Sequence, residues 1–130
     1  MAGMRKFVGI PEAFRELAPG AQWAVHDNDY DKVTWYTPEI PMPSREAVEA
    51  KVAELEAGEP MRALREVRDW YLQQCDWTQC QDIRAIKGTE WCERWDTYRQ
   101  ELRDMTKTAQ PAWSEMNLLT NIDWPQMPPK

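Results

Sequence analysis

The stretch TEWCERWDTYRQELRDM, residues 89–105, decides the fold, because its large apolar residues recur at helical spacing. Four of them are separated by four, three and four positions: Trp91, Trp95, Tyr98 and Leu102. Residues at these spacings share one face of an α-helix. The sequence therefore predicts a helix here whose aromatic face packs in the core. The charged residues between them, Arg99 included, are expected to face solvent.

Two more helical patterns precede this stretch. Ser44 can cap a helix over about 45–57, and Gly58 is a suitable residue to end it. A second helix over about 60–75 carries apolar residues near one face. These are Met61, Leu64, Val67, Tyr71 and Leu72. The pattern predicts two separate helices.

The N-terminal part favours short elements. IPEAFREL, residues 10–17, predicts a short helix with proline in its first turn. AQWAVHDNDYDKVTWYT, residues 21–37, alternates apolar residues on both sides of an Asp- and Asn-rich reversal, which predicts a small β-hairpin. PEIPMP, residues 38–43, is expected to be a rigid extended linker.

The last 25 residues, 106–130, are polar and marked by prolines, which predicts an extended tail. Their large apolar residues follow no helical or strand period. Trp113 and Trp124 can therefore dock either on the chain's own core or on another protein, and both alternatives remain open. The candidate partner-binding residues are Trp113, Leu118, Leu119, Ile122, Trp124 and Pro125. The expected fold is mainly α with a small N-terminal β-hairpin. The expected division is 1–43, 44–105 and 106–130.

The segment QQCDWTQCQD, residues 73–82, is expected to be a helix break and restart. Asp76 followed three residues later by Gln79 matches a capping box. Trp77 would then enter the core and fix the angle between two helices, and Asp82 would be another turn or cap residue.

Metal and catalytic sites have weak support. Three cysteines and the single histidine are spaced irregularly, whereas structural zinc sites show tight cysteine pairs. Free, partly buried thiols are the preferred interpretation, with zinc as the alternative. DNDYD, residues 27–31, lacks the glycine and distal glutamate of a calcium loop. We therefore expect no metal, no cofactor and no enzyme activity. The residues concerned are Cys75, Cys80, Cys92 and His26.

Composition excludes further classes. A net charge of −6 argues against binding nucleic acid through its phosphates. No window reaches the roughly 18 apolar residues of a membrane span, and the first residues lack the apolar core of a signal peptide. We expect a protein made in a cytoplasm, with reduced thiols and no membrane partner. Eight tryptophans in 130 residues suggest a ring-rich core or partner anchors.

Three segments read in order resemble bacteriophage tail assembly chaperones and tail-fibre assembly proteins. They are REVRDWYLQQCDWTQCQD, WDTYRQELRDM and IDWPQMP, within residues 65–128. The motif positions matched are Arg68, Asp69, Leu72, Asp76, Trp77, Thr78, Gln79, Asp82, Trp95, Tyr98, Arg99, Gln100, Leu102, Arg103, Asp104 and Trp124 with Pro125. Residues from about 17 to 57 also resemble the N-terminal part of marine-phage proteins.

This resemblance implies binding rather than catalysis. The partner would be a tail or tail-fibre polypeptide, bound in the host cytoplasm during assembly. The alternative is a permanent structural component of the virion tail or fibres. A homo-oligomer is possible under either interpretation.

Overall fold

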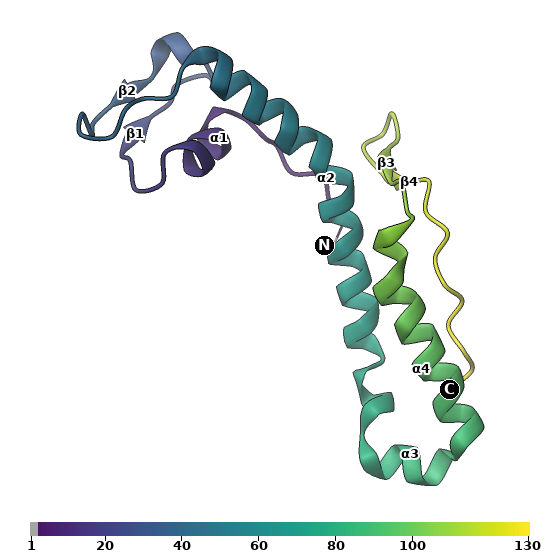
Figure 1. The fold of residues 1–130 in the computed structure, drawn as a ribbon. Helices are drawn as coiled ribbons and strands as arrows, with labels where there is room; N and C mark the ends of the chain where they lie inside the picture. The colour runs from purple at the N-terminus through teal and green to yellow at the C-terminus, as the bar shows by residue number, and fades with distance from the viewer. Residues whose placement is uncertain (1–2) are drawn as a thin grey trace. The chain divides into compact units, whose positions relative to one another are not determined.

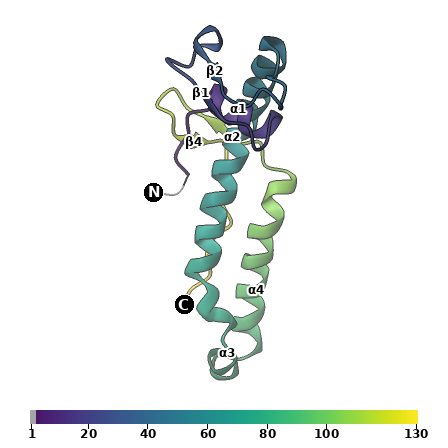
Figure 2. The same ribbon diagram turned by 90° about the vertical axis from the view of Figure 1, so that its left-hand side faces the viewer.

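The structure is a computed structural model that describes residues 3–130. It divides into two compact units (Figures 1 and 2). The N-terminal unit is Lys6–Glu59, and the C-terminal unit is Pro60–Lys130 together with residues 3–5. The fold is mainly α with small antiparallel strand pairs, which confirms the expected fold class. The expected division into 1–43, 44–105 and 106–130 stays a prediction.

The helix α2, Arg45–Gln74, passes through the boundary between the units, so the prediction of two separate helices was wrong. Gly58 does not adopt the left-handed conformation of a helix terminator. Pro60 lies inside the helix, where it has no N–H for the preceding turn. Residues of α2 on both sides of Gly58 and Pro60 are buried: Val48 is 1% exposed and Leu64 is 0% exposed. Burial of these side chains outweighs the weak helix propensity of the Gly-Glu-Pro segment.

The N-terminal unit contains α1, Ile10–Leu17, and the predicted hairpin. Strand β1, Trp23–Ala24, pairs antiparallel with β2, Thr34–Trp35, and Trp23 lies opposite Trp35. A 3₁₀ turn, η1, Tyr30–Lys32, lies in the connection. Both tryptophan rings contact Phe14, at centroid distances of 5.3 and 5.2 Å. The hairpin and α1 therefore share one small core.

The predicted aspartate-rich reversal holds the start of α1. Asp27 and Asn28 have positive φ angles of 56° and 50°, a conformation that Asn and Asp tolerate well. The Asn28 side-chain oxygen accepts a 2.8 Å hydrogen bond from the backbone N–H of Ile10. The reversal is therefore built as a polar turn.

The C-terminal unit follows from the second part of α2. The 3₁₀ turn η2, Asp76–Gln79, leads to α3, Gln81–Lys87, and then to α4, Thr89–Asp104. A last 3₁₀ turn, η3, is Met105–Lys107. Both views show α4 beside this part of α2 (Figures 1 and 2). The predicted break and restart, and the helix over 89–105, are confirmed to within a residue.

The tail contains a second hairpin that the sequence did not reveal. Strand β3, Ala112–Trp113, pairs antiparallel with β4, Leu119–Thr120. The Ser114 hydroxyl accepts hydrogen bonds from the N–H groups of Met116 and Leu118, at 3.2 and 3.1 Å. Asn117 adopts a positive φ of 59°. Each strand is only two residues long, which is too short for an alternation of apolar residues to mark it in the sequence.

Candidate functional site

The predicted aromatic face of α4 is buried. Trp91, Trp95, Tyr98 and Leu102 are 6, 0, 4 and 1% exposed. The Trp77 ring, carried by η2, lies 5.7 Å from Trp91 and 5.8 Å from Trp95. Distances of this size between ring centres are typical of tilted and edge-to-face aromatic contacts. This aromatic cluster holds η2 against α4, and it leaves little of these rings for a partner.

Arg99 corrects an expectation, because it is 8% exposed and not solvated. Its guanidinium donates to the carbonyl oxygen of Leu72 at 2.9 Å and to the Asp76 carboxylate at 3.0 Å. It also donates to the Cys75 sulfur at 3.1 Å. Burial opposes the charge, but the hydrogen bonds to Cys75 and Asp76 outweigh it and raise the pKa of Arg99. Arg99, which belongs to α4, thus supplies a hydrogen-bond donor and a positive charge to the carbonyl groups at the C-terminal end of α2.

The predicted capping box at Asp76 and Gln79 was wrong. The residue before η2 makes no side-chain cap, and the Asp76 carboxylate accepts from Arg99 instead. Gln79 donates to the Thr78 hydroxyl and the Asp96 carboxylate, at 3.1 and 3.3 Å. The spacing of a capping box is present, but tertiary partners on α4 use both side chains.

A second polar contact fixes α3 on α4. Both oxygens of Asp96 accept 2.9 Å hydrogen bonds from Arg84. These bonds, opposed by some desolvation, lower the pKa of Asp96 below its ordinary value, and Gln79 adds to the effect. Asp82 lies in the first turn of α3. Its expected role as a turn or cap residue stays a prediction.

Part of the tail lies on the chain's own core. Leu119, Ile122 and Trp124 pack against the hydrophobic core of the C-terminal unit, which contains Leu64, Leu102 and Met105 as well as the aromatic residues of α4. The Trp124 ring lies 5.1 Å from that of Tyr71 on α2. These three were expected as partner-binding candidates, and their packing leaves them less surface for that role. Trp113 is partly buried, with the Arg5 guanidinium 5.8 Å from its ring centre.

Exposed apolar side chains remain at the tip of the second hairpin. Met116 is 80% exposed and Leu118 is 61% exposed. The two Ser114 hydrogen bonds and the Arg5 hydrogen bond to the Asn117 side chain, at 2.8 Å, hold the tip in shape. We call residues 114–118 the apolar tip. A preordered loop that presents apolar side chains loses little entropy on docking.

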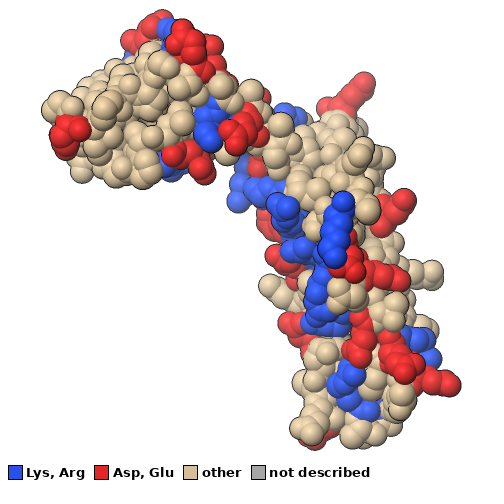
Figure 3. Space-filling view, in the orientation of Figure 1, with Lys and Arg blue, Asp and Glu red and all other residues tan. Residues whose placement is uncertain are grey.

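Basic side chains also gather on the C-terminal unit. Figure 3 shows them along this part of α2, where Arg62, Arg65 and Arg68 recur every three residues. Two have acidic partners nearby: Arg62 with Glu66 at 2.6 Å, and Arg68 with Asp69 at 2.8 Å. The basic face is thus partly neutralised by its own helix. The expected absence of nucleic-acid binding stays a prediction.

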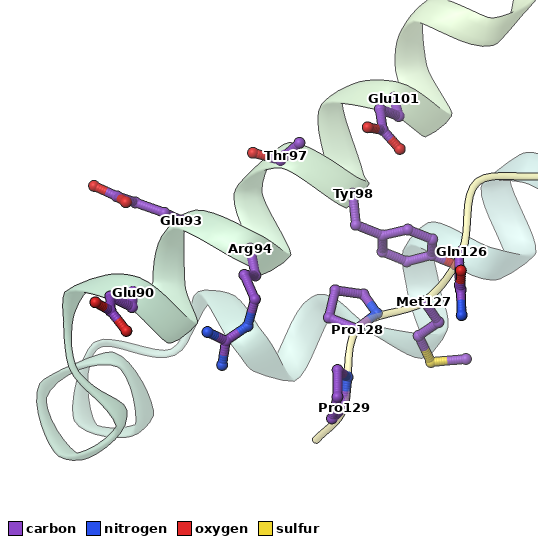
Figure 4. Close-up of a pocket in the computed structure, with 10 residues that line it drawn as sticks. All are labelled: Glu90, Glu93, Arg94, Thr97, Tyr98, Glu101, Gln126, Met127, Pro128 and Pro129. Carbon is purple, nitrogen blue, oxygen red and sulfur yellow. The ribbon is translucent and has the colours of Figure 1, made fainter.

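A groove lies between α4 and the last residues of the chain (Figure 4). It has a volume of about 590 Å³. Its α4 wall consists of Glu90, Glu93, Arg94, Thr97, Tyr98 and Glu101. Its other wall consists of Gln126, Met127, Pro128 and Pro129. We call this space the α4 groove.

The cysteines are free thiols, with Cys75 and Cys92 buried and Cys80 exposed. Within residues 3–130, no three His, Cys, Asp or Glu side chains gather as metal ligands. No helix of the described chain is both long and apolar enough to cross a bilayer.

The C-terminal unit thus combines a ring-rich helical core, an apolar tip and a groove. Residues 61–129 match the family described as phage tail assembly chaperone protein, and the chain belongs to that family. The match covers nearly the whole C-terminal unit and none of the N-terminal unit. It supports an accessory role in tail assembly and suggests a protein that is not an enzyme.

No curated protein and no solved structure matches the chain. The likeness of the N-terminal part to marine-phage proteins falls outside the matched residues and stays a prediction.

Proposed function

We propose that this protein binds a tail or tail-fibre polypeptide during phage tail assembly, in the host cytoplasm, through the apolar tip of its second hairpin. Family membership supports the assembly role. The observation that carries the binding surface is the exposure of Met116 and Leu118 on a hydrogen-bonded turn. Isolated apolar residues are common on surfaces, but two on one preordered turn make a compact anchor.

This proposal revises which tail residues contact the partner. Leu118 remains a direct contact, and Met116 joins it. Trp113, Leu119, Ile122, Trp124 and Pro125 would support the hairpin and its attachment to the helices. Under this assignment, substitutions in the supporting set weaken binding through loss of folding, and substitutions at the tip weaken binding alone.

The experiment is co-expression with each tail and tail-fibre polypeptide of the encoding phage, followed by co-purification. A Met116→Ser/Leu118→Ser variant is compared with Met4→Ser/Ile86→Ser, which removes apolar residues of 60 and 80% exposure elsewhere. We expect the wild-type protein and the second variant to retain one tail polypeptide, and the tip variant to lose it. Equal retention by both variants would place the contact elsewhere.

The same material separates transient from permanent association. A transient assembly factor is present in complexes with newly made tail polypeptide and depleted from purified particles. A structural component of the tail or fibres is present in particles in stoichiometric amount. We propose the first, with quantitative mass spectrometry of particles as the measurement.

A further inference from the structure

The α4 groove shows an unbalanced charge. Three of its lining residues are glutamates and one is an arginine, which leaves a net charge of −2. The other carboxylates of α4 have basic partners, Asp96 with Arg84 and Asp104 with Lys107, at 2.9 and 3.0 Å. Within residues 3–130, Glu90, Glu93 and Glu101 form no ion pair. The unpaired carboxylates of this helix are therefore concentrated at the groove.

Tyr98 and Met127 line the groove from opposite walls. Tyr98 points from α4 toward Gln126 and Met127 (Figure 4). It is 4% exposed, and its hydroxyl forms no hydrogen bond with residues 3–130, but it is not among the fully buried polar atoms, so solvent reaches it. Burial raises the pKa of Tyr98 above its ordinary value. Met127 is 48% exposed on the opposite wall. A ligand can bury Met127 and replace solvent at the Tyr98 hydroxyl together.

The dimensions favour an extended ligand. Glu90 and Glu101 are eleven residues apart on α4, which places them about 16 Å apart along the helix axis. An extended segment of about five residues spans that distance. An α-helix would need about eleven residues to span the same distance, so a short ligand must be extended to reach both glutamates.

We propose that the α4 groove binds an extended peptide segment that carries lysine or arginine residues and at least one apolar side chain. The cations pair with the glutamate row, and the apolar side chain contacts Met127 and the Tyr98 ring. This inference rests on the proposed function in one respect: the bound segment is taken to belong to a tail polypeptide. Groove and apolar tip are then two separate contacts with the same partner.

The probe is a fluorescent peptide of about eight residues that alternates lysine and leucine, with lysine–serine and glutamate–leucine peptides for comparison. The full chain is titrated at about 0.05 M and 0.5 M salt. The groove variant is Glu90→Gln/Glu93→Gln/Glu101→Gln. The matched control is Glu16→Gln/Glu39→Gln/Glu46→Gln, which removes three negative charges at exposed positions outside the groove.

We expect the lysine–leucine peptide to bind the wild-type chain and to lose affinity about tenfold in the groove variant, with little change in the control. High salt should weaken binding, and Met127→Ser should reduce the preference for leucine over serine. Equal losses of peptide affinity in the groove variant and the control variant would mean that only the overall charge of the protein matters, and this result would overturn the proposal. So would absence of peptide binding, or no preference for leucine.

Failure of this inference is distinguishable from failure of the proposed function. If co-purification of a tail polypeptide depends on Met116 and Leu118 while the groove variant behaves as wild type, the function stands and the groove inference fails. If the groove binds the peptide but no tail polypeptide co-purifies, the groove assignment stands and the proposed partner is wrong.

Discussion

Arg99 on α4 donates a 2.9 Å hydrogen bond to the carbonyl oxygen of Leu72 in the last turn of α2. The two residues are 27 positions apart. A helix ends with carbonyl groups that lack intrahelical partners, and a cation there is favourable. This contact joins the two long helical segments of the C-terminal unit at the point where the chain leaves α2.

Replacing Arg99 by methionine should therefore destabilise the C-terminal unit. The change removes hydrogen bonds to Leu72, Cys75 and Asp76, and we expect a loss of about 2–3 kcal/mol in the free energy of unfolding. Chemical denaturation followed by tryptophan fluorescence measures it. The control is Arg103→Met, whose only hydrogen bond within residues 3–130 is a 3.4 Å contact with Gln100. Similar losses in both variants would contradict the assigned role.

Asp96 should make stability depend on pH in the acid range. Its folded-state pKa is lowered, so its ion pair with Arg84 stabilises above the unfolded-state pKa of about 3.9 and is lost as pH falls through the folded value. The pair is partly exposed, so solvent screens it and its contribution is small. We expect Asp96→Asn to be less stable than wild type at pH 7, with the difference shrinking below pH 4. A difference that is constant with pH would argue against this ion pair.

Trp95 should be the most sensitive residue of the aromatic cluster. It is 0% exposed and contacts the rings of Trp77, Trp91 and Tyr98. We expect Trp95→Ala to cost about 3–5 kcal/mol through lost burial and a cavity. The control of the same residue type is Trp70→Ala, at a position that is 47% exposed. A stable Trp95→Ala protein that had lost only partner binding would place this face on an interface.

Trp124 should contribute to folding although it lies in the tail. Its contact with Tyr71 predicts a loss of about 1–3 kcal/mol for Trp124→Ala, and deletion of residues 106–130 should lower the thermal midpoint further. Thermal unfolding followed by circular dichroism measures both. Met116→Ala, which changes an exposed residue, serves as the control. If the truncated chain keeps its full stability, the tail is a free ligand for a partner.

The sequence predicted those elements whose signals are local. The aromatic face of α4 follows from spacings within one helix, and the first hairpin follows from alternation around a polar turn. Both are confirmed. Local signals also explain the error at Gly58, because weak propensity predicts a break where burial of Val48 and Leu64 on both sides holds one helix together.

The candidate site was harder to predict because its contacts are distant in sequence. Arg99 lies four positions after Trp95 and three before Leu102, so its spacing matches the buried face, but spacing alone does not reveal the partners that allow an arginine to be buried there. Its partners at the end of α2 become visible only in three dimensions. The α4 groove likewise depends on where residues 126–129 lie, since nothing in their composition predicts contact with α4.

The most direct test of the central claim is assembly itself. A phage that lacks the gene for this chain is complemented with the wild-type protein, with Met116→Ser/Leu118→Ser, or with the control Met4→Ser/Ile86→Ser, and assembled tails are counted by electron microscopy. The account predicts few tails without the protein, recovery with the wild type and the control, and little recovery with the tip variant. Normal numbers of tails in the absence of the protein would contradict the account.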